Sequence, residues 1–140
     1  MVPSRNRRRG VSKTTHTLQS METVCLLARG NSLTFGICQS AMNLATHSGN
    51  LALTAKFCGV LLDNFEAVCP ANHPETANHH AWRCTVLKRI LAGDGRCASI
   101  PKKLEQEYRG LIQTSRKRCL EIRKVCFGEE HPLVSESELI

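Results

Sequence analysis

The stretch from residue 51 to residue 65 sets the fold class, because its apolar side chains recur every three or four residues. Asn50 precedes it as a good helix N-cap, and the Cys69-Pro70 pair marks its end. No segment of useful length alternates apolar and polar residues as a half-buried strand would. The chain is therefore predicted to be all-α. The residues that share one face of this helix are Leu51, Ala55, Cys58, Leu62 and Phe65.

Turn signals divide the rest of the chain into four further helices. Pro74 and Pro101 suit the first turn of a helix, and Gly128 is a typical residue for a helix end. The chain has only six aromatic residues, so its core must be built from Leu, Ala, Val, Ile and Cys, which suits packed helices. The predicted ranges are 17–29, 33–47, about 74–91, and about 99–127, in addition to the helix that follows Asn50.

A chain of 140 residues is long enough for one hydrophobic core and predicts a single domain. We expect a compact bundle of about five helices over residues 15–128. Residues 1–14 are expected to form a flexible basic arm, because such a run buries no apolar area. Residues 129–140 are acidic and interrupted by proline, which predicts a loose tail.

The sequence shows no secretory signal and no apolar segment long enough to span a bilayer, which predicts a cytoplasmic or nuclear protein. In those compartments the eight cysteines are expected to be mostly thiols or metal ligands and not a disulfide framework. Secretion by an unconventional route would reopen the interpretation of the even count as disulfides.

The charge balance favours a polyanionic partner. Lys and Arg number 19 against 12 acidic residues, which gives a net charge of +7. The segment "RNRRRG" holds four arginines in six positions: Arg5, Arg7, Arg8 and Arg9. It is a phosphate-binding arm, a nuclear-import signal or a solvated tail, and the sequence does not decide between these.

The predicted helix 99–127 carries the strongest functional pattern. Four basic residues recur at intervals of seven, and three more lie one position further along, so both rows are expected to form one continuous stripe. Eight basic residues between positions 102 and 124 outnumber three acidic ones, so local ion pairs cannot neutralise the helix. The candidate nucleic-acid-binding residues here are Lys102, Lys103, Arg109, Arg116, Lys117, Arg123 and Lys124.

This pattern predicts a non-enzymatic protein that binds RNA, or less favourably DNA, through backbone charge and shape. The scarcity of aromatic residues argues against base stacking. Two other classes stay open: a helical adaptor that docks an acidic protein, and a peripheral protein on an acidic membrane surface. Self-association is a further expectation, since a long helix with residual apolar surface often packs against a copy of itself.

The segment "CPANHPETANHHAWRC" allows one structural zinc ion. Cys69, His73, His80 and Cys84 offer four ligands of the types that zinc prefers, at the junction of two predicted helices. His79 and Cys97 are substitutes. The alternative is that Cys84 packs in the core and the histidines face solvent, because the chain has no CxxC pair. No nucleophile elbow, P-loop, dinucleotide-binding glycine pattern or HExxH motif is present, so we expect no enzymatic activity.

The basic arm, the Cys69–Cys84 cluster and "KKLEQEYRGLIQTSRKRCLEIRKVC" together resemble the small cysteine-rich, basic accessory proteins of positive-strand RNA plant viruses. The resemblance implies RNA binding and, in some members, suppression of RNA silencing. The chain departs from better-known members in lacking CxxC pairs. The resemblance assigns no role to an individual residue.

Overall fold

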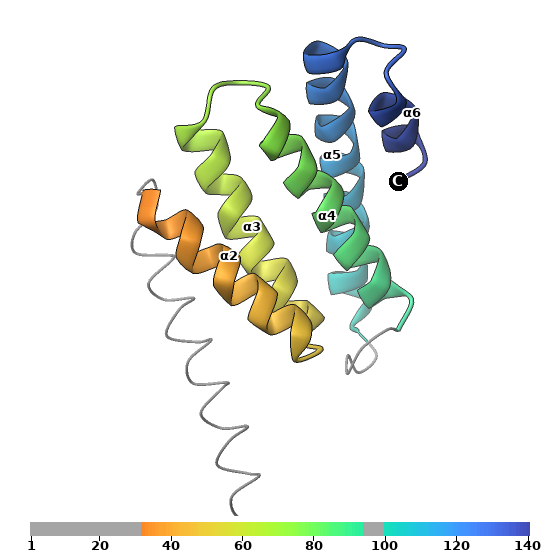
Figure 1. Cartoon of the computed structure of the whole chain (residues 1–140). Helices are drawn as coiled ribbons and strands as arrows, with labels where there is room; N and C mark the ends of the chain where they lie inside the picture. The colour runs from red at the N-terminus through yellow and green to blue at the C-terminus, as the bar shows by residue number, and fades with distance from the viewer. Residues whose placement is uncertain (1–31, 94–99) are drawn as a thin grey trace, which may run out of the picture.

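The computed structural model describes residues 32–93 and 100–140, and this part of the chain is all-α, as predicted (Figure 1). The predicted helix 17–29, the basic arm and Cys97 lie outside the described residues. No strand occurs in the two described segments. The helices are α2 (Ser32–His47), α3 (Leu51–Val68), α4 (Pro74–Leu91), α5 (Lys102–Phe127) and α6 (Pro132–Glu138).

Local sequence signals account for the helix ends. The side chain of Asn50 accepts a hydrogen bond from the Leu53 amide at 3.2 Å, which caps α3 as predicted. His73 caps α4 in the same way, since its Nδ1 accepts from the Glu75 amide at 3.1 Å. Gly128 ends α5 with a φ of 87°, a conformation that favours glycine.

Each helix packs against the next one in the chain (Figure 1). The chain reverses direction between successive helices, and α4 lies between α3 and α5. Buried side chains of α2 and α3 form one apolar cluster, and those of α4 join Leu51 and Ile112 in a second. Trp82 packs against both clusters and so connects the two halves of the bundle.

Small side chains fill much of this core. Ala41, Ala45, Ala77 and several cysteines are completely buried, in keeping with the low aromatic content. Among the described cysteines Cys58, Cys69, Cys84, Cys119 and Cys126 are free thiols, as predicted. Cys38 is disulfide-bonded, so the prediction of mostly free thiols holds for the other described cysteines and not for this one.

The C-terminal segment is more ordered than the expected loose tail. His131 Nδ1 accepts from the Leu133 amide at 3.2 Å and caps α6, which packs against α5. Val134 and Ser137 are buried there. The acidity of this segment is confined to its exposed face, which is why composition alone underestimated its structure. No helix in either described segment is long and apolar enough to cross a membrane.

Gly110 within α5 and Gly128 at its C-cap provide a test of the α5 backbone. A Cβ at Gly110 would meet no atom within 4 Å, so Gly110→Ala should raise the free energy of unfolding by about 0.5–1 kcal/mol. Gly128→Ala should lower it by about 1 kcal/mol, because alanine is strained at positive φ. Urea denaturation measures both. A destabilised Gly110→Ala variant would contradict this account of α5.

Candidate functional site

The basic residues predicted to form one stripe divide between the surface and the interior. In the row spaced by seven residues, Lys102 is exposed, the Arg109 side chain is 66% exposed, Arg116 is half-buried and Arg123 is only 6% exposed. A repeat of seven drifts by about 20° per repeat around a straight helix. Three repeats therefore carry the row from solvent into the packing interface.

Arg123 is consequently not a surface residue, and the prediction of one continuous stripe is wrong at this position. Its Nη1 donates to Ser137 Oγ at 2.7 Å and its Nη2 donates to Asn78 Oδ1 at 3.2 Å. It thus joins α5 to both α6 and α4. Within the two described segments Arg123 has no carboxylate partner, so these neutral oxygens stabilise its buried charge. Arg116 also contacts α6, since its Nη2 donates to the Glu138 carbonyl.

The second row stays on the surface. Lys103, Lys117 and Lys124 are all exposed, because the same drift moves this row toward the middle of the solvent-facing side. Arg109 pairs with Glu105 at 2.9 Å in an exposed ion pair of small energetic value. We call the remaining cations the α5 basic face: Lys102, Lys103, Arg109, Arg116, Lys117 and Lys124.

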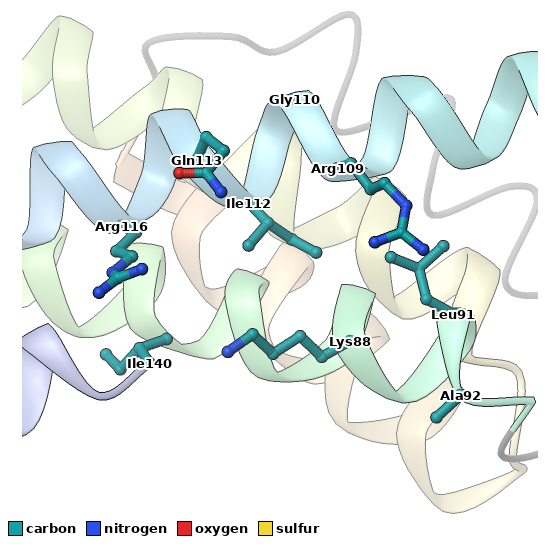
Figure 2. Close-up of a pocket in the computed structure, with 9 residues that line it drawn as sticks. All are labelled: Lys88, Leu91, Ala92, Arg109, Gly110, Ile112, Gln113, Arg116 and Ile140. Atoms are coloured by element: carbon teal, nitrogen blue, oxygen red, sulfur yellow. The ribbon is translucent and has the colours of Figure 1, made fainter.

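A pocket of about 630 Å³ lies between α4 and α5 beside this face (Figure 2). Lys88, Arg109 and Arg116 place three cationic side chains along it, and no acidic side chain lines it. Sequence reasoning missed Lys88. The Lys88-Arg89 pair in the last turn of α4 was a visible signal, but its distance in sequence from α5 concealed the juxtaposition. Ile112, Leu91 and Ile140 supply apolar lining.

The four candidate zinc ligands occupy different environments. Cys69 ends α3 and His73 caps α4, whereas His80 and Cys84 are buried further along α4. The Cys84 thiol contacts the Ile112 carbonyl at 3.5 Å. Within residues 32–93 and 100–140 no group of three His, Cys, Asp or Glu residues is arranged to hold a metal ion.

Arg118 ties the α3–α4 turn to α5. Its Nε lies 3.3 Å from Glu66 Oε1 at the end of α3, and its Nη1 donates to Asn72 Oδ1 at 3.0 Å within the turn. The Cys126 thiol donates to the Asn72 carbonyl at 2.9 Å, and Asn72 has a φ of 61°. These contacts attach the cysteine- and histidine-rich turn to α5 through protein groups.

A chain of hydrogen bonds crosses the interior beside Arg118. Arg83 Nε donates to Ser115 Oγ at 2.6 Å, and Ser115 Oγ lies 3.1 Å from His80 Nδ1. His80 Nε2 lies 3.4 Å from Glu66 Oε1. An ionised Glu66 only accepts hydrogen bonds, so its contact with a neutral His80 requires the imidazole proton on Nε2. Nδ1 is then an acceptor, and the Ser115 hydroxyl donates to it.

The environment of His80 keeps it neutral. Burial lowers the pKa of His80, and the neighbouring Arg83 and Arg118 charges act in the same direction, while Glu66 opposes them. Burial acts to raise the pKa of Glu66, but the Arg118 and His80 hydrogen bonds and charges outweigh it and the net pKa is lowered. A neutral His80 beside an ionised Glu66 agrees with the proton positions inferred above.

Ser115, His80 and Glu66 are the residue types of a hydrolytic triad, but their setting is structural. Ser115 has no exposed surface, and its hydroxyl oxygen already accepts from Arg83. A nucleophile must reach a substrate carbonyl, and a completely buried hydroxyl does not. We interpret the three residues as polar packing between α3, α4 and α5.

Comparisons of this chain with protein-family models, with curated proteins and with solved structures found no match. The functional interpretation therefore depends on the α5 basic face, the pocket and the buried polar chain.

Ser115→Ala tests the buried chain. The substitution leaves Arg83 Nε and His80 Nδ1 without their shared partner, which should lower the free energy of unfolding by about 1–3 kcal/mol. Thr114→Ala is the matched control on the exposed side of α5 and should change it by less than about 0.5 kcal/mol. Equal effects in urea denaturation would contradict the structural role of Ser115.

The lowered pKa of His80 makes stability depend on pH. The unfolded chain takes up a proton at this histidine near pH 6.5, whereas the folded protein resists it. Stability is therefore expected to fall as the pH decreases below about 6.5, and this slope should be shallower in His80→Gln. Denaturation at several pH values measures the slope. An NMR titration of the His80 ring with a pKa at or above 6.5 would contradict it.

Proposed function

We propose that the protein binds nucleic acid, preferably RNA, by contacting the phosphate backbone with the α5 basic face. One observation carries the proposal: six cationic side chains at exposed or half-exposed positions follow a single helix. From Lys102 to Lys124 they extend over about 33 Å, a length that covers roughly one turn of a duplex, the B-form DNA turn being roughly 34 Å.

Most of the positive charge of the α5 basic face is not neutralised by acidic partners. Three of the eight basic residues of α5 have contacts within the fold: Arg118 and Arg123 are held by side chains of other elements, and Arg116 donates to the Glu138 carbonyl of α6. Of the three acidic residues of α5, Glu105 pairs with Arg109 and Glu121 lies 3.8 Å from the interior-facing Arg118. Lys102, Lys103, Lys117 and Lys124 form no ion pair within the described residues. They are free to neutralise phosphates and release counterions.

The shape of the surface favours backbone recognition over base recognition. An exposed helix with well-separated lysines contacts phosphates as point charges, without the planar side chains on which unpaired bases stack. The N-terminal segment would add further cations to the contact: Arg5, Arg7, Arg8 and Arg9. The preference for RNA, and suppression of RNA silencing as a biological role, derive from the resemblance to viral accessory proteins.

Binding should depend steeply on salt. The logarithm of the association constant is expected to fall linearly with the logarithm of salt concentration, by about 0.9 per duplex phosphate contacted or about 0.7 per single-strand phosphate. The triple variant Lys103→Gln, Lys117→Gln, Lys124→Gln should reduce that slope by about 2–3. Fluorescence anisotropy with labelled RNA and DNA duplexes of one sequence, and with single strands, measures both quantities.

Lys56→Gln is the control, because it removes an exposed lysine from α3. It should leave the salt slope nearly unchanged. Circular dichroism should show the same helicity for every variant, since the substituted side chains are all exposed. If no RNA or DNA binds with a salt-dependent affinity, or if the triple variant binds like the parent, the proposal is wrong. Binding to acidic vesicles or an acidic protein alone would favour one of the other two classes.

A further inference from the structure

The pocket between α4 and α5 has a composition that the extended basic face does not share. Cations from two helices meet there: Lys88 from α4, and Arg109 and Arg116 from α5 (Figure 2). Its volume of about 630 Å³ lies within the roughly 300–1,000 Å³ range of small-molecule sites. A solvated lysine row contacts a polymer along its length, whereas an open hollow of this size holds one compact group against its wall.

The lining is polar at some positions and apolar at others. Figure 2 shows the Lys88 and Arg116 side chains extending toward the space near Ile140, while Arg109 lies beside Leu91. Ile112 is nearly buried at the α4–α5 contact, and the Gln113 amide adds both hydrogen-bond donors and an acceptor. The pocket therefore offers cationic groups for an anion and an apolar wall for an organic group attached to it.

The number of cations indicates which anion fits. A phosphate monoester carries about −1.5 to −2 charges at pH 7, whereas a phosphodiester within a strand carries one. Three cationic side chains line the pocket and no acidic side chain does. Arg109 is paired with Glu105, and the two positive charges that remain match the monoester better than the diester. Arginine adds bidentate donors for phosphate oxygens, and lysine adds a point charge.

We infer that this pocket binds a phosphate monoester attached to a nucleoside-sized organic group, with Lys88, Arg109 and Arg116 around the phosphate. The two sources of that chemistry are a free mononucleotide and the phosphorylated end of a nucleic-acid strand. The pocket shares Arg109 and Arg116 with the α5 basic face, and to that extent the strand-end source rests on the proposed function. Lys88 belongs to the pocket alone.

Calorimetric titration of the full chain with AMP, adenosine and 3′,5′-cyclic AMP tests the inference. AMP should bind at least about tenfold more tightly than adenosine, which lacks the phosphate, and than the cyclic diester, which carries a single charge. Lys88→Gln should weaken AMP binding about tenfold, and Arg109→Gln similarly. Lys124→Gln removes the same charge from the α5 basic face outside the pocket and should have little effect. Equal affinity for AMP and adenosine, or equal effects of Lys88→Gln and Lys124→Gln, would overturn the inference.

The source of the monoester is decided with oligonucleotides that carry a 5′-phosphate or a 5′-hydroxyl. If a strand end is the ligand, the 5′-phosphate should tighten binding in the parent and not in Lys88→Gln. If AMP binds and the 5′-phosphate adds nothing, the pocket takes the free mononucleotide. If the parent protein binds AMP but shows no salt-dependent binding to long nucleic acid, the proposed function is wrong and the pocket inference stands. If it binds long nucleic acid with a salt-dependent affinity but does not bind AMP, the pocket inference alone is wrong.

Discussion

The packing of α4 against α5 is the contact on which the rest of the structure depends. At this interface Ala77, Cys84, Ser115 and Cys119 are completely buried, and their small side chains allow the two helices to approach closely. Small residues bury little apolar area each, so the interface also uses directed polar contacts. Hydrogen bonds there join Ser115 to both Arg83 and His80, and these bonds orient α5 against α4. His80 also contacts Glu66, which positions α3. The orientation of α5 in turn decides which of its cations reach solvent.

Most of the bundle was predictable from local sequence signals. Asn50, Pro74 and Gly128 each have one strongly favoured position at a helix end, and the helices between them fall where the turn residues indicate. The exposed lysines of α5 were also predictable, because no packing partner competes for a solvent-facing row. The N-cap of α6 was less visible, since histidine is an uncommon capping residue and the acidic composition masked the buried Val134 and Ser137.

The candidate site was only partly predictable, because it depends on contacts between distant segments. A row of residues spaced by seven drifts by about 20° per repeat, but the spacing does not show at which residue the row becomes buried. That residue depends on where α6 packs, which no local pattern specifies. The burial of Arg123 against Ser137 and Asn78 is therefore a tertiary fact. The meeting of Lys88 with Arg109 and Arg116 is tertiary for the same reason. Likewise, the contacts of His80 with Ser115 and Glu66 on other helices do not follow from its spacing within α4, from which it was one of four candidate zinc ligands.

Arginine and lysine have different structural roles in this bundle, and these contacts explain why. Every lysine in the described segments is exposed, whereas the cations at half-buried or buried positions are Arg83, Arg116, Arg118 and Arg123. A guanidinium has five donors in a fixed plane and is less strongly hydrated than an ammonium, so it tolerates burial among neutral oxygens. Four arginines can thus hold helices together while the lysines remain hydrated and available to a polyanion. In a basic helix of this kind, an arginine one or two positions from the buried apolar residues indicates packing against another helix. A row of lysines further from those apolar residues indicates the binding surface.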